Sequence, residues 1–127
     1  MKRVVADASA LAALIFEEPD ADVVDVQVRG AELWAPTLLQ FELANVAWKK
    51  MRRQPDKGVE ILAALRAFFA GHPIQWVDVD LTDVVLTAQQ TGLTPYDASY
   101  VWLAGSIGAD LVTLDQRLAS SGADGPV

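Results

Sequence analysis

The chemistry open to this chain is limited first by the side chains that it lacks. Its 127 residues include no Cys and one His, His72, which stands in the turn-like sequence Gly71-His72-Pro73. This composition excludes a Ser-His-Asp triad, a Cys-His pair and a zinc site with the usual ligands. The glycines are too far apart to form a phosphate-binding loop. Any catalysis therefore depends on carboxylates, whose hard oxygens favour Mg²⁺ or Mn²⁺.

Four acidic residues stand out by their sequence context: Asp7, Glu42, Asp97 and Asp115. Asp7 and Asp115 each follow a short apolar run, which predicts a position at the carboxyl end of a strand. Asp97 comes three residues after Thr94, a potential helix cap. Each also has an ordinary structural explanation, because acids stabilise helix N-termini and occur in turns after strands. Their common placement is the stronger indication of a shared site.

Glu42 interrupts an almost entirely apolar sequence, Leu38 to Trp48. A charge in such a helix requires a partner, a ligand or exposure to solvent. Asn45, Lys49 and Arg53 follow at +3, +7 and +11 and share its helical face. This polar stripe is consistent with either a functional or a merely solvated face.

Short β-like runs alternate with helical ones along the chain. Strands are predicted at 2–7, 32–35, 74–79 and 110–114. Helices are predicted from Ser9 as cap to about Glu18, from Asp20 to about Arg29, from Thr37 to about Arg53, and at 56–70, 82–91, 94–107 and 115–120. The alternation predicts a single α/β domain over 1–127, a sandwich of helices around a mostly parallel sheet of four to five strands. In such folds, sites form beyond the carboxyl ends of the strands.

The bulk charge and hydropathy restrict the class of protein. The net charge of −7 opposes a broad electrostatic contact with nucleic acid, although positions 49–57 carry half of the ten basic residues. No apolar run is long enough to cross a membrane, and the N-terminus does not have the pattern of a signal peptide. With no Cys as well, the expected location is the cytoplasm.

Four segments of the chain resemble the motifs of PIN domains. They are Val4–Leu11 around Asp7, Glu42 with Asn45 before a basic run, Thr94–Ala98 around Asp97, and Leu111–Asp115. Their order and spacing hold over almost the whole chain. The small size also resembles the VapC toxins of bacterial VapBC toxin–antitoxin pairs.

The resemblance implies a metal-dependent endoribonuclease with a PIN-like three-layer fold. The four acids would hold Mg²⁺ or Mn²⁺, with Ser9, Asn45 and Thr113 hydrogen-bonding to the acids or their water. The metal would activate a water molecule for in-line attack on a phosphate, leaving 5′-phosphate and 3′-hydroxyl ends. The implied partners are an RNA substrate, a cognate antitoxin and a second copy of the chain.

Two surfaces are expected to bind these partners. Lys49 and Arg53 would contact RNA phosphates flanking the cut, while Lys50 and Arg52 point elsewhere. The large apolar side chains exceed what a core of this size needs, and an amphipathic antitoxin helix would cover the excess, reaching the acids with an Arg or Lys. The residues expected there are Phe16, Leu38, Phe41 and Trp48.

Two alternatives stay open, and one part of the sequence departs from the family pattern. A catalytically inactive PIN-like binding module is possible, as is an acid-dependent phosphatase with Asp7 as nucleophile. Phosphatases of the haloacid dehalogenase type have a second Asp two residues later, where this chain has Ser9. The polar residues 120–127 leave little sequence for the final strand that relatives commonly have.

Overall fold

Four short strands form an entirely parallel sheet at the centre of the molecule. The computed structural model describes residues 1–124. The strands are β1 (Arg3–Ala6), β2 (Glu32–Pro36), β3 (Ile74–Val77) and β4 (Asp110–Val112), and their order in the sheet is β3-β2-β1-β4. Because β1 pairs on both sides, with Val4 opposite Leu33 and Asp110, the N-terminal strand is internal. All four carboxyl ends therefore lie at one edge.

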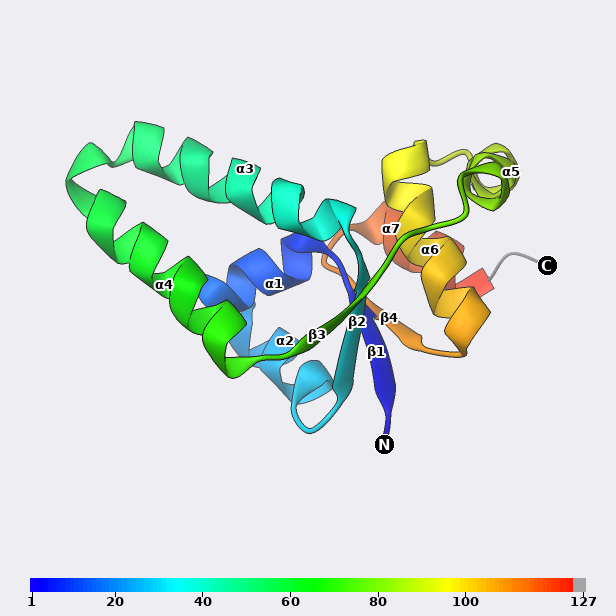
Figure 1. Cartoon of the computed structure of the whole chain (residues 1–127), viewed down its shortest axis with the longest axis horizontal. Coiled ribbons are helices and arrows are strands. Elements are labelled where there is room, and N and C mark those ends of the chain that lie inside the picture. The colour runs from blue at the N-terminus through cyan, green and yellow to red at the C-terminus, as the bar shows by residue number, and fades with distance from the viewer. Residues whose placement is uncertain (125–127) are drawn as a thin grey trace.

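Helices cover both faces of this sheet (Figure 1). They are α1 (Ala8–Ile15), α2 (Ala21–Val28), α3 (Leu38–Arg53), α4 (Gly58–Gly71), α5 (Leu81–Thr91), α6 (Pro95–Ile107) and α7 (Gln116–Asp124), with a 3₁₀ turn η1 (Pro55–Lys57) between α3 and α4. In Figure 1, α1 and α2 lie on one side of the sheet and α5 to α7 on the other, while α3 and α4 form a long hairpin. The predicted α/β fold, a parallel sheet between helices, is confirmed.

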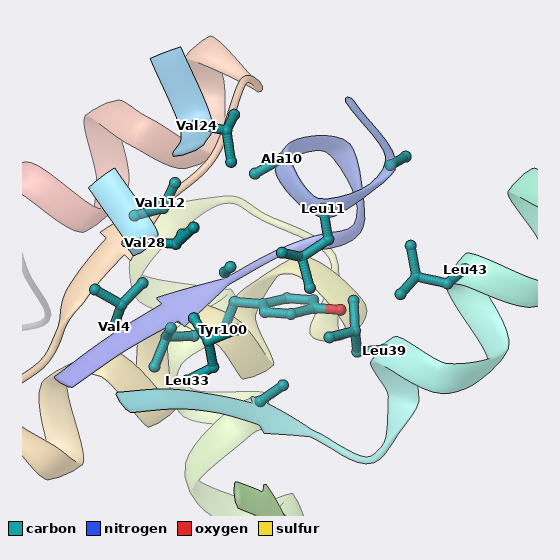
Figure 2. Close-up of a cluster of buried hydrophobic side chains, with 14 of the residues drawn as sticks. Val4, Ala10, Leu11, Val24, Val28, Leu33, Leu39, Leu43, Tyr100 and Val112 are labelled. Atoms are coloured by element: carbon teal, nitrogen blue, oxygen red, sulfur yellow. The ribbon is translucent and has the colours of Figure 1, made fainter. Parts of the chain in front are cut away.

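Tyr100 lies in the middle of the main core. It is 1% exposed and is surrounded by apolar side chains from β1, β2, α1 and α3. Figure 2 shows its ring beside Leu11, Leu33 and Leu39, with the hydroxyl oxygen turned toward α3. Since a buried phenol requires a hydrogen-bond partner, this orientation indicates a polar acceptor on α3.

The structure corrects several predicted helix ends. The cap of α1 is Asp7 and not Ser9, which lies in the first turn, and the helix ends at Ile15 instead of about Glu18. Thr37 and Asp20 precede their helices without making a side-chain cap bond. By contrast, Thr94 caps α6 as predicted, accepting a hydrogen bond from the backbone N–H of Asp97 at 3.3 Å.

The C-terminal region is more helical than the sequence predicts. α7 continues to Asp124, beyond the predicted end at Ser120, so the described part of this region is helical and adds no strand to the sheet. Residues 125–127 lie outside the described part of the chain. Among the described helices, none has the length and apolarity needed to cross a membrane.

Candidate active site

The carboxylate of Asp7 is the most firmly held of the four predicted acids. Asp7 directly follows β1, caps α1 and is only 6% exposed. Its Oδ1 accepts hydrogen bonds from the backbone N–H of Ala10 at 3.0 Å and from the Ser9 hydroxyl at 2.7 Å. Its Oδ2 accepts one from the Thr113 hydroxyl at 2.5 Å. A carboxylate has about four acceptor positions, so Oδ2 can still bind one more group.

Ser9 and Thr113 join the two ends of the chain around this carboxylate. The Ser9 hydroxyl accepts a hydrogen bond from the backbone N–H of Leu114 at 3.0 Å, and Thr113 accepts one from that of Asp115 at 3.0 Å. β4 is thereby tied to the first turn of α1. The position of these two side chains agrees with the orienting function expected for them, which itself stays a prediction.

Glu42 is the acceptor on α3 that the buried Tyr100 requires. The Tyr100 hydroxyl donates to Oε1 of Glu42 at 2.5 Å. Burial raises the pKa of Glu42, the bond from Tyr100 opposes that rise, and the negative charges of Asp97 and Asp7 add to it. The sequence allowed two interpretations of Glu42, a solvated acid or an acid with a bonding partner. The structure supports the second, and the partner is the neutral phenol of Tyr100.

Asp97 lies in the first turn of α6, three residues before Tyr100 and on the same helical face. Burial raises the pKa of Asp97, and the charges of Asp115 and Asp7 raise it further, whereas Arg117 lowers it. Within the described residues, neither carboxylate oxygen of Asp97 accepts a hydrogen bond. Asp97 is therefore a partly desolvated carboxylate that other acids repel.

Asp115 has a clear structural function. Its Oδ1 accepts hydrogen bonds from the backbone N–H groups of Arg117 at 2.9 Å and Leu118 at 3.3 Å, so that it caps α7. The side chain is exposed, and its charge acts on Asp97. Asp115 therefore caps α7 and also lies at the margin of the acidic group.

Electrostatic coupling links all four acids at the carboxyl edge of the sheet. Asp7 acts on Glu42 and on Asp97, Asp97 acts on Glu42, and Asp115 acts on Asp97. The donors are hard oxygens, which suit Mg²⁺ or Mn²⁺. In the described structure, however, no three Asp, Glu, His or Cys side chains are close enough together to form a ready-made metal cage. Mg²⁺ usually keeps several waters and uses one or two carboxylates, so this looser arrangement fits a hydrated cation.

The polar side chains of α3 fall into two groups by their contacts. Asn45, Lys49 and Arg53 are exposed, and none of their side chains forms a hydrogen bond or ion pair with the rest of the described chain. Lys50 instead pairs with Glu18 at 2.8 Å. Arg52 stacks over the Trp48 ring, 4.9 Å from its centroid. Asn45 therefore makes no contact with the acids in this structure, and the function expected for it stays a prediction.

Two residues near the acids were missed in the sequence. Tyr100 reads as an ordinary core aromatic, although its spacing of three from Asp97 on one helix places both on a single face. Arg117 has no recognisable pattern in the sequence, because its position near Asp97 depends on how α7 turns back after β4. Only the first of these carried a usable signal.

Comparison with known proteins agrees with this fold. The family model for the PIN domain matches residues 4–122. The chain is 38% identical over 121 residues to Ribonuclease VapC3 of Pyrobaculum aerophilum, with 92% of each chain covered. It is 30% identical over 118 residues to Ribonuclease VapC12 of Mycobacterium tuberculosis, covering 93% of this chain and 91% of that one.

Solved structures give the same assignment. The crystal structure of PAE2754 from Pyrobaculum aerophilum superposes with a TM-score of 0.77 at 30% identity, covering 94% of this chain and 84% of that one. VapBC2 from Rickettsia felis, solved with a promoter DNA fragment, has a TM-score of 0.59 at 16% identity, with coverages of 89% and 87%, and shows the shared fold alone. The chain belongs to the PIN domain family.

Replacing Glu42 by Gln should stabilise the metal-free protein at neutral pH. A carboxyl whose folded pKa is raised binds its proton more tightly in the folded state, so stability falls as pH rises through the unfolded value of 4.5 and the folded value above it. The amide keeps an acceptor for Tyr100 and removes the charge. In EDTA, we expect Glu42→Gln to melt at a higher temperature than the parent at pH 7 and the two proteins to converge near pH 4.

The matched control is Glu60→Gln, which removes an equal charge from an exposed position on α4. Its melting temperature should follow that of the parent at every pH. A Glu42→Gln protein that melts no higher than the parent at pH 7 would contradict the repulsion among the acids.

Proposed function

We propose that this protein is a Mg²⁺- or Mn²⁺-dependent endoribonuclease that acts as the toxin of a toxin–antitoxin pair. The observation that carries the proposal is the set of four electrostatically coupled carboxylates at the carboxyl edge of a PIN fold. Two relatives that share most of their length with this chain are named ribonucleases of the VapC type, which supports the choice of RNA as substrate.

The acids are arranged so that each keeps oxygen atoms available for a cation. Glu42 and Asp115 each accept hydrogen bonds at one carboxylate oxygen within the described chain, so the other oxygen is available. In Asp7 both oxygens accept hydrogen bonds, but Oδ2 accepts only one and can bind a further group. Asp97 has both oxygens available. We assign all four as the residues that hold the metal and hence as catalytic. When bound there, Mg²⁺ supplies positive charge that polarises a phosphate and acidifies water.

The chain's own groups fix the geometry of this site. Ser9 and Thr113 hold the Asp7 carboxylate in one orientation, and Tyr100 does the same for Glu42. A cation would offset the mutual repulsion of the acids, which gives the site a driving force for binding metal even before RNA arrives.

Asp7→Asn should abolish RNA cleavage while leaving the fold intact. Asn caps helices about as well as Asp, so α1 keeps its N-cap, but the amide removes a negative ligand from the metal site. We expect cleavage of a mixed-sequence single-stranded RNA by the parent with Mn²⁺, no cleavage in EDTA, and none by the variant with either.

The control for this experiment is Asp22→Asn, at an exposed position on α2. It should cleave as the parent does. Cleavage by the parent in EDTA would refute the metal dependence, and cleavage by a folded Asp7→Asn protein would refute the assignment of Asp7.

We propose that RNA runs along α3 away from the acids. Lys49 and Arg53 lie on the face that carries Glu42, roughly 10 to 17 Å further along the helix at about 1.5 Å rise per residue. Both side chains are exposed and have no acidic partner in the described structure. Their positive charges are thus available for phosphates that flank the cut.

The double variant Lys49→Ala/Arg53→Ala should weaken RNA binding and reduce its salt dependence. Losing two phosphate contacts lowers the slope of log K against log salt by about 1.4 for a single strand. The control is Lys50→Ala/Arg52→Ala, which removes the same charge from the same helix at side chains that contact Glu18 and Trp48. If both double variants change the slope equally, α3 acts only through its net charge.

We further propose that the antitoxin occupies a groove between α1, α3 and α4. The groove has a volume of about 760 Å³, and its apolar wall includes Phe16, Ile61 and Phe68. Of the four apolar residues expected from the sequence, only Phe16 lines it. Phe41 and Trp48 are 75% and 53% exposed on α3 but lie outside the groove. Ile61 and Phe68 are already buried, so an amphipathic helix would cover mainly Phe16 and would meet charges of both signs. The charged residues that line the groove are Glu17, Asp25, Lys50, Lys57 and Glu60.

Ala67→Glu should separate inhibition from catalysis. Ala67 lines the groove and is exposed, so a carboxylate there obstructs an apolar partner without disturbing the core. We expect the variant to cleave RNA at the parental rate and to escape inhibition by the antitoxin encoded beside it. Ala63→Glu, also exposed on α4 but outside the groove lining, is the matched control. Equal inhibition of both variants would place the antitoxin elsewhere.

A homodimer is also proposed for this protein, as expected from its family. The exposed apolar side chains Leu81, Val85 and Leu86 on α5 support it, since a second copy would remove them from water.

A further inference from the structure

A further basic position lies on α7, which Figure 1 shows on the other side of the sheet from α3. Arg117 belongs to the first turn of α7, and its backbone N–H donates to Oδ1 of Asp115, one of the four acids, at 2.9 Å. Its guanidinium is exposed and forms no hydrogen bond or ion pair with any described residue. Within the described residues Arg117 therefore keeps its charge available, although the chain carries a net charge of −7.

The side chain borders an open pocket between the end of α5 and α7. The pocket has a volume of about 420 Å³ and is lined by Thr91, Gly92, Leu93, Gln116, Arg117, Ser120 and Ser121. Thr91 and Ser121 donate their hydroxyl hydrogens to backbone carbonyls, of Thr87 and Arg117 respectively. Arg117, Gln116 and Ser120 make no side-chain hydrogen bond within the described chain, so their donors are free.

Ser120 is the helical neighbour of both other groups, because it follows Gln116 by four residues and Arg117 by three. Asp115 caps the helix through the backbone N–H groups of Arg117 and Leu118. No acidic side chain lines the pocket. It therefore offers a guanidinium, an amide and a hydroxyl, a donor set suited to phosphate oxygens.

We propose that this pocket is a phosphate subsite in which Arg117, assisted by Gln116 and Ser120, binds an RNA phosphate on the far side of the cut from Lys49 and Arg53. The subsite rests on the proposed ribonuclease function and adds to it the course that the RNA backbone takes across the protein. RNA would pass from the α3 stripe across the four acids to α7, so that cations hold the backbone on both sides of the scissile bond. Arg117 acts here as a positioning residue and not as a metal ligand.

The test measures RNA binding separately from cleavage. The probe is a fluorescently labelled mixed-sequence single-stranded RNA, titrated in EDTA at several salt concentrations with the parent, Arg117→Gln and Arg117→Lys. We expect Arg117→Gln to bind about fivefold more weakly, because exposed charge pairs contribute up to roughly that factor. The salt slope should fall by about 0.7, the value for one phosphate on a single strand. Arg117→Lys keeps the charge and should restore the slope.

The matched control is Arg66→Gln, which removes the same charge from an exposed site on α4 outside the pocket. It should leave the slope at the parental value. The proposal is overturned if Arg117→Gln leaves the salt slope of RNA binding unchanged. It is also overturned if Arg66→Gln lowers that slope by the same amount.

Cleavage with Mn²⁺ separates this proposal from the function on which it rests. If the parent cleaves the probe and Arg117→Gln binds it with an unchanged slope, the subsite is wrong and the ribonuclease function stands. If the parent neither binds nor cleaves the probe, the proposed function fails and the subsite falls with it. A higher KM with a nearly unchanged kcat for Arg117→Gln supports positioning of the substrate.

Discussion

The buried carboxylate of Asp7 is the constraint on which the rest of the site depends. It caps α1, accepts a hydrogen bond from Ser9 within that helix, and accepts another from Thr113, 106 residues later. A buried charge is tolerated only when such bonds replace water. The same bonds fix the junction of β1, α1 and β4 at one edge of the sheet. The other acids are positioned relative to this junction by the helices that follow the strands.

Stability and function oppose each other at this edge. Burial and mutual repulsion raise the pKa of Glu42 and of Asp97, which means that the folded protein holds these charges at a cost. A carboxylate kept by packing alone would be replaced by an apolar side chain at little penalty. Two carboxylates held at such a cost, one of them bonded to a core tyrosine, are understandable when a cation and a phosphate compensate their charge.

Much of this organisation follows from local sequence. The parallel pairing agrees with the alternation of short apolar runs and helices, and Thr94 with Pro95 marks the start of α6. Asp7 and Asp115 are identified by the strands that precede them. The helix caps were less predictable, because Asp7 and Ser9 are both good caps and stand two residues apart. In the structure it is Asp7 that accepts the backbone N–H of Ala10. The bond between Tyr100 and Glu42 spans 58 residues, and the position of Arg117 depends on the turn after β4, so neither is encoded by a local pattern.

The internal position of β1 determines how late in synthesis the acidic site can be completed. During synthesis β1 emerges first, yet one of its two neighbours, β4, is among the last segments made. Until Thr113 and α7 have left the ribosome, the Asp7 carboxylate lacks one of its hydrogen bonds, and Asp115 and Arg117 are absent. A nascent or truncated chain therefore has no assembled site. Completion of the site therefore depends on contacts between distant parts of the sequence, which can form only when nearly the whole sequence has been translated.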